Sequence, residues 1–134
     1  MPMRITVSRF ERLLIGVASG DLTRQDLGRF FLEIVEGGLL DYRKIVDIAG
    51  CNPVVTAAEL EAFGAVVRAA HKGGPPAPLA IVAHEQQNAV AALFAKLTAD
   101  VRPAHVFRSI HEARRWIEQN SPQVASPSRR DSEP

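Results

Sequence analysis

The sequence has little of several residue types and patterns that mark particular classes of protein. It contains one cysteine, and its 16 Lys and Arg residues nearly balance 15 Asp and Glu residues, for a formal net charge of +1. One thiol excludes an internal disulfide, and a near-neutral chain has no strong field to attract nucleic acid or an acidic membrane. No apolar run approaches the roughly 20 residues that span a bilayer, and the first residues do not resemble a signal peptide. These absences predict a cytoplasmic protein that binds no nucleic acid and makes no stable membrane insertion.

Spacings typical of metal and cofactor sites are missing as well. The histidines show neither HxH nor HExxH spacing, and the single cysteine supplies no Cys-rich ligand set. The glycine-rich segment 73–76 precedes an expected strand, whereas a phosphate-binding loop follows one. We therefore predict no metal and no cofactor.

The apolar patterns that are present predict five strands. Residues 3–7 and 13–18 alternate or run apolar and are expected to pair as a hairpin. Residues 45–48, 79–83 and 104–107 are short, continuous apolar runs, which are typical of parallel strands buried on both faces. The sheet is therefore expected to be mostly parallel after its N-terminal hairpin.

Four helices are expected between and after these strands, from apolar residues spaced three and four apart. The first ends at Gly37 and Gly38, and the second ends near residues 71–74. The apolar positions of the four helices are Leu27, Phe30, Phe31, Ile34 and Val35; Leu60, Phe63, Val67 and Ala70; Val90, Leu93, Phe94 and Leu97; and Ile110, Ala113 and Ile117.

This order of elements predicts an α/β fold: a mostly parallel sheet of four to five strands with an N-terminal antiparallel hairpin, covered by four helices. A chain of 134 residues is long enough for one such domain with its own core. We place that domain in residues 1–120. Residues 121–134 are rich in Ser, Pro and charge without apolar periodicity, so they are expected to form a disordered tail.

Three of the helices are preceded by a hydroxyl residue with an acid three positions later, the pattern of a capping box. The pairs are Thr23 with Asp26, Thr56 with Glu59, and Ser109 with Glu112. A capping role alone explains each hydroxyl, since its loss typically costs about 1 kcal/mol.

Asp47, Cys51 and His84 are the candidates for chemistry. Asp47 lies near the carboxyl end of an expected parallel strand, the edge where open α/β sheets place ligand sites. It either contacts a ligand or, more commonly for a buried acid, accepts hydrogen bonds from residues 49–51. Cys51 has no nearby residue to activate it and is expected to pack as a small apolar side chain. His84 follows the next strand, where it could reach the edge that carries Asp47.

Two segments resemble the SpoIIAA-like, or STAS-like, family. Residues 44–50, Lys-Ile-Val-Asp-Ile-Ala-Gly, are similar to the family strand that ends in Asp-Leu-Ser-Gly. Residues 106–117 are similar to the closing strand and helix, with a Phe, an Ala and a Trp-aliphatic pair. The resemblance extends loosely over residues 3–119 and implies the fold shared by anti-sigma factor antagonists and many small bacterial proteins of unassigned role.

The resemblance also implies a non-enzymatic protein-interaction or regulatory module with a protein partner. The phosphorylated serine of the antagonists falls on Thr56, making it a candidate phosphoacceptor, although Val55-Thr56-Ala57-Ala58 lacks the acid, one hydroxyl and the glycine of the Asp-Ser-Ser-Gly motif. The expected interaction or ligand face consists of Asp47, Cys51, Asn52, Thr56, Glu59 and His84.

Three alternatives stay open. A looser resemblance to Sec14-type lipid carriers implies binding of a small apolar or lipid-like ligand, although a chain of this length lacks their extra helices, so we expect no sizeable apolar cavity. An enzyme would require Asp47, Cys51 or His84 to converge in one pocket. A homodimer is also possible, through an apolar patch or the hairpin edge. The candidate patch residues, each equally suited to the core, are Phe10, Leu39, Leu40 and Trp116.

Overall fold

Five strands form one sheet in the order of the chain. The computed structural model describes residues 3–74 and 77–120, so the expected tail at 121–134 lies outside the described residues. The strands are β1 (Met3–Ser8), β2 (Leu13–Thr23), β3 (Arg43–Val54), β4 (Leu79–Val82) and β5 (Ala104–Phe107). β1 pairs with β2 in antiparallel orientation, and every later pair is parallel. The expected α/β class, with a hairpin followed by a parallel sheet, is confirmed.

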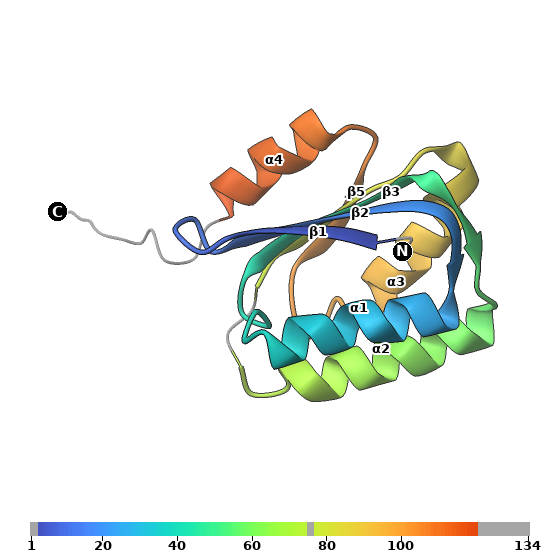
Figure 1. The fold of residues 1–134 in the computed structure, drawn as a ribbon, viewed down its shortest axis with the longest axis horizontal. Helices are drawn as coiled ribbons and strands as arrows, with labels where there is room; N and C mark the ends of the chain where they lie inside the picture. Colours follow the sequence, from blue (N-terminus) through green and yellow to red (C-terminus); the bar gives the residue numbers. More distant parts are fainter. Residues whose placement is uncertain (1–2, 75–76, 121–134) are drawn as a thin grey trace, which may run out of the picture.

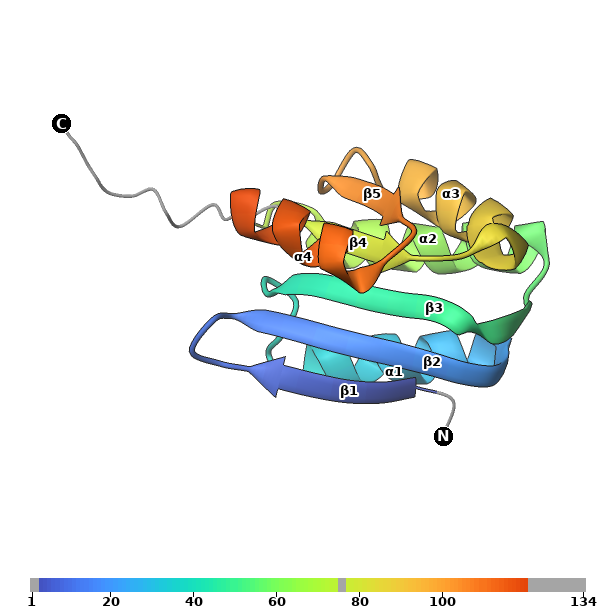
Figure 2. The same cartoon turned by 90° about the horizontal axis from the view of Figure 1, so that it is seen from above.

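The helices divide unequally between the two faces of the sheet. Figures 1 and 2 show α1 (Arg24–Glu36), α2 (Ala57–His71) and α3 (Asn88–Leu97) on one face, and α4 (Ile110–Gln119) on the other. The connections from β2 to β5 all step in one direction across the sheet, so right-handed crossovers place their helices on the same face. α4 follows the last strand, is not a crossover, and covers the opposite face. No helix in the described ranges is both long and apolar enough to cross a membrane.

β2 and β3 are longer than the sequence pattern indicated. They stay paired as far as Thr23 and Val54, although Ser19, Gly20 and Asp21 interrupt the apolar pattern of β2. The register shifts by one residue after Val17, so β3 has an extra residue at a bulge. Because of that shift, Ile48 and Cys51, an odd number of residues apart, belong to the same core cluster.

The reciprocal capping box is confirmed at α1 and α2, and its hydroxyl half is confirmed at α4. At α2, the Glu59 backbone N–H donates to Thr56 Oγ1 over 3.1 Å, and the Thr56 N–H donates to Glu59 Oε1 over 3.0 Å. Thr23 and Asp26 form the same reciprocal box before α1. At α4, Ser109 Oγ accepts the Glu112 N–H over 3.2 Å. Each hydroxyl therefore has a structural task at the start of its helix.

Two apolar clusters lie on the two faces of the sheet. The cluster under α4 is compact, with Ile45 and Ala80 fully buried against Ala113 and Ile117. The larger cluster lies between the sheet and α1–α3, and it includes Leu39, which is 6% exposed. Leu39 is therefore a core residue, which is one of the two alternatives that the sequence left open for it. Phe10 of that patch is 98% exposed, because it lies in the turn between β1 and β2.

Candidate functional site

The three residues considered for chemistry have different surroundings in the structure. Asp47 Oδ1 accepts the backbone N–H of Ala49 over 3.0 Å, which is the structural alternative that the sequence left open. Its neighbours Val46 and Ile48 line a cavity on the α1–α3 face. Alternation along β3 therefore directs Asp47 to the other face. Neither Asp47 nor His84 lines that cavity, and His84 is exposed before a short 3₁₀ turn, η1 (Glu85–Gln87).

Cys51 is a packed side chain. It is 5% exposed, and burial raises the pKa of its thiol to about 11, with the charge of Asp47 acting in the same direction. Gln87 Nε2 donates a hydrogen bond to the Cys51 backbone oxygen over 2.9 Å, and this bond connects β3 to the 3₁₀ turn. A thiol with this pKa carries little thiolate at neutral pH, so it is a poor nucleophile.

The other members of the expected face lie at the exposed end of the β2–β3 extension. Asn52 Nδ2 donates to Asp21 Oδ1 over 3.0 Å and ties the two strand ends together. Glu59 Oε2 lies 3.5 Å from Arg24 Nε, which joins the start of α2 to the start of α1. Thr56 is exposed while its hydroxyl caps α2. The structure thus brings Asn52, Thr56 and Glu59 to one end of the fold.

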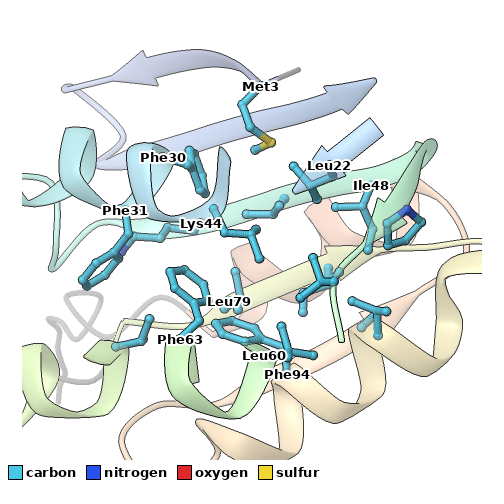
Figure 3. A pocket seen from close by; sticks show the side chains of 18 of the residues that line it. Met3, Leu22, Phe30, Phe31, Lys44, Ile48, Leu60, Phe63, Leu79 and Phe94 are labelled. Carbon is cyan, nitrogen blue, oxygen red and sulfur yellow. The ribbon is translucent and has the colours of Figure 1, made fainter. Parts of the chain in front are cut away.

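A cavity lies between the sheet and α1–α3. Its volume is about 80 Å³. Two of its lining residues are charged and the others are apolar. The lining comprises Met3, Leu22, Leu27, Phe30, Phe31, Ile34, Lys44, Val46, Ile48, Pro53, Val55, Leu60, Phe63, Val67, Leu79, Ile81, Val90, Ala91, Phe94 and Arg102. Figure 3 shows side chains from both layers converging on this space.

A line of three aromatic rings forms much of the helix side of the cavity. Phe31 of α1 meets Phe63 of α2 edge to face, with ring centroids 6.0 Å apart. Phe63 stacks on Phe94 of α3, with centroids 5.5 Å apart. The rings bridge the three helices to one another. Across the cavity, Val46 remains partly accessible although it lies in the central strand β3. The two layers therefore do not close fully on each other.

The charged end of the cavity consists of Lys44 and Arg102, which are 2% and 5% exposed. Lys44 Nζ donates to the backbone oxygens of Leu40 and Tyr42, each over 2.7 Å. Figure 3 shows Lys44 on β3, between the α1 rings on one side and Phe63 of α2 on the other. Both cations lie at the amino ends of parallel strands, since Lys44 is the second residue of β3 and Arg102 precedes β5.

Arg102 is held by weak contacts. Its Nη1 lies 3.5 Å from His71 Nε2, and its guanidinium carbon lies 5.7 Å from the centre of the Phe94 ring. Its Nε is buried and has no hydrogen-bond partner among the residues that the structure describes. His71, 4% exposed at the end of α2, places Nδ1 2.9 Å from the Val67 backbone oxygen. In residues 3–74 and 77–120, no carboxylate forms an ion pair with Lys44 or Arg102.

Burial lowers the pKa of all three basic groups. The pKa of Lys44 falls to about 7, because the ammonium is desolvated and Arg102 adds positive charge, while Asp41 acts weakly in the opposite direction. Burial lowers the pKa of Arg102 to about 10. Burial also lowers the pKa of His71, and the charges of Arg102 and Lys44 add to the effect. The cavity therefore ends in a cluster of basic side chains without a counter-ion among the described residues.

The sequence did not point to this site. Lys44 belongs to the segment that resembles the family strand, and Arg102 and His71 belong to no motif. A signal in the sequence is a basic residue beside the start of an apolar run: Lys44 directly precedes the run 45–48, and Arg102 lies two residues before the run 104–107. Among the described residues, no group of three His, Cys, Asp or Glu side chains is arranged to hold a metal ion.

Comparison with known proteins supports the fold and leaves the function open. No family model matches the sequence, and no curated protein matches it at a significant level. A similar solved structure is that of an uncharacterized protein of the DUF3478 family, with a SpoIIAA-like fold, from Shewanella loihica PV-4. The two chains superpose with a TM-score of 0.56 and 19% identity over 86% of this chain and 91% of the other. The chain therefore has a SpoIIAA-like fold, as its sequence indicated.

Proposed function

We propose that this SpoIIAA-like protein binds a small, largely apolar ligand in the cavity between its sheet and α1–α3. The observation that supports the proposal is the cavity itself, whose wall is apolar except at one end. A gap between packed layers costs stability, because its lining side chains lose contacts with neighbouring atoms. A ligand that filled it would restore those contacts, so the fold gains from occupancy.

The size of the cavity limits the ligand to a small molecule. On this measure one water molecule needs about 10–15 Å³, so a volume of about 80 Å³ holds the equivalent of roughly five to eight waters. At about 30 Å³ of liquid volume per water, that is space for roughly six to nine carbon-sized atoms. A full membrane lipid exceeds this size.

A cavity-filling substitution tests the proposal with 1-hexanol as the probe. In a two-dimensional amide NMR titration, 1-hexanol should shift resonances of residues that line the cavity, such as Val46 and Ile81, in the wild type. Ala91→Leu places a larger side chain at a lining position, so the shifts should be lost or require at least about tenfold more hexanol. Ala92→Leu is the matched control, one residue away on the exposed side of α3.

The hexanol-induced shifts in the two variants distinguish binding inside the cavity from binding elsewhere. Shifts that survive unchanged in Ala91→Leu, or that appear only at exposed positions, would contradict binding inside the cavity. Loss of the shifts in Ala91→Leu together with their retention in Ala92→Leu would support it. Chemical-shift dispersion of each variant provides the check that both remain folded.

The protein-interaction role is a second proposal, and it is compatible with the first. In the segment 53–56, residues alternate between the cavity and the surface. Pro53 and Val55 line the cavity, whereas Val54 is 50% exposed and Thr56 is also exposed. A ligand would therefore touch the same segment that presents side chains to a partner. We expect a Thr56→Glu variant to lose a protein that wild type retains from its native cells. Unchanged partners in that pull-down would count against this face.

A further inference from the structure

We propose that the cavity accepts an amphipathic anion, a medium-chain carboxylate whose head contacts Lys44 and Arg102 and whose tail lies among the apolar lining residues. The inference rests on the proposed function and goes further by assigning the head group and the orientation of the ligand. It derives from the basic cluster at one end of the cavity.

The positive charges at the end of the cavity have no counter-charge among the described residues. Lys44 and Arg102 both line the cavity and are buried, yet no acidic side chain in the described ranges pairs with either. Burying an unpaired cation is costly, and proteins normally supply a partner. Asp41, whose charge acts on Lys44, instead pairs with Arg12 at the surface. An anion in the cavity would supply the missing counter-charge.

Lys44 and Arg102 also have N–H groups that remain available to donate hydrogen bonds. Within residues 3–74 and 77–120, Arg102 Nε is buried without a partner, and Nη1 makes a long contact of 3.5 Å to His71 Nε2. The Lys44 ammonium has three N–H groups, and two of them donate to backbone oxygens. A carboxylate has two oxygens that accept in parallel from a guanidinium fork. Its binding would satisfy donors that the fold leaves without acceptors.

The charged and apolar lining residues lie at different positions along β3. Lys44 lies at the amino end of β3, whereas the apolar residues Ile48, Pro53 and Val55 line the cavity farther along the same chain. From Lys44 to Ile48 the strand extends about 13 Å, at roughly 3.3 Å per residue. The site is therefore polar at one end and apolar along its length. This matches a molecule with one small charged head and an unbranched tail better than it matches a free anion or an uncharged apolar compound.

The cost of desolvation is lower here than for most buried ion pairs, which favours binding of the anion. Pairing two ions inside a protein usually requires both to lose their hydration, which offsets most of the attraction. Here the two cations are already desolvated in the folded chain, as their lowered pKa values indicate. Only the incoming carboxylate has to lose hydration, so most of the charge–charge attraction contributes to affinity.

The test compares hexanoate, 1-hexanol and acetate as NMR titrants at pH 6, where hexanoate is ionised and Lys44 is mostly protonated. Wild type should bind hexanoate about 10- to 100-fold more tightly than 1-hexanol, because hydrogen bonds to charged groups contribute more than neutral ones. Acetate, which has the head without the tail, should bind much more weakly than hexanoate.

Arg102→Met removes the guanidinium and keeps an apolar side chain of similar length. This variant should lose the preference for hexanoate while still binding 1-hexanol, which shows that its cavity is intact. Arg102→Lys should retain part of the preference. Arg108→Met is the matched control, since Arg108 is exposed and does not line the cavity.

The relative affinities for hexanoate, 1-hexanol and acetate test the head group, the tail and the cavity separately. If wild type binds 1-hexanol in the cavity but hexanoate no more tightly, the anionic head is wrong and the proposed function stands. If Arg102→Met keeps the full preference for hexanoate, the head group lies elsewhere and the inference fails. If acetate binds as tightly as hexanoate, the tail contributes nothing and the amphipathic ligand is overturned. If neither hexanoate nor hexanol enters the cavity, the proposed function fails as well.

Discussion

In a Lys44→Met variant, the free energy of unfolding should no longer rise between pH 7 and pH 9 as it does in the wild type. The folded protein holds the pKa of Lys44 at about 7, well below its ordinary value of 10.5. Between these two values the unfolded chain binds a proton that the folded chain does not, so stability increases with pH. Over two pH units the contribution is about 2 to 3 kcal/mol.

This pH window isolates Lys44 from the other shifted groups. His71 titrates below its ordinary pKa of 6.5, and Arg102 titrates near pH 10. Cys51 has a raised pKa of about 11, so its effect on stability has the opposite sign and lies mostly above pH 9. The variant retains all three groups, so their contributions largely cancel in the comparison.

Urea unfolding of wild type and Lys44→Met at pH 7, 8 and 9 gives the required free energies. Lys96→Met is the matched control, because Lys96 is exposed on α3 and should leave the pH dependence unchanged. Parallel pH profiles for wild type and Lys44→Met would show that the ammonium is not desolvated in the folded state. That result would remove the basis for an anion-binding end of the cavity.

The second large effect is expected from isoleucine-to-alanine substitutions on the two faces of β3. Ile45 is fully buried under α4 in the compact cluster, and Ile48 lines the cavity on the opposite face. Truncating a buried Ile costs about 2–5 kcal/mol, with the larger costs where the site cannot relax. Ile45→Ala should fall at the high end, and Ile48→Ala should be milder by about 1–2 kcal/mol, because Ile48 already faces empty space.

The same strand carries both substitutions, so strand propensity and chain position are matched. Chemical denaturation of the two variants gives the comparison directly. Equal losses at the two positions, or a greater loss at Ile48, would mean that the α1–α3 face is packed as tightly as the α4 face. The cavity would then not persist in solution.

Much of the fold could be predicted from the sequence because its signals are local. The spacing of Leu27, Phe30 and Ile34 identified α1, and the hydroxyl–acid pairs located the starts of α1, α2 and α4. The apolar run of β4 correctly indicated a strand buried on both faces. The ends of β2 and β3 were missed, since their last residues are held by pairing with each other and not by an apolar pattern.

The site was less predictable, for physical reasons. The expected face contains residues at the carboxyl ends of the strands, and its roles for Thr56 and His84 stay predictions. The cavity depends on how far three helices lie from the sheet, which is set by the rings of Phe31, Phe63 and Phe94 packing on one another. Its basic end depends on burial of Lys44 and Arg102, 58 residues apart in the numbering. No local pattern encodes either distance.

The central claim is that a small apolar molecule enters the space between the sheet and α1–α3. The most direct measurement is the set of intermolecular nuclear Overhauser effects between 1-hexanol and the methyl groups of the wild-type protein. We expect effects to Val46 and Ile81, which line the cavity. Effects only to Val54 and Val66, which are 50% and 56% exposed, or no effects at all, would contradict it.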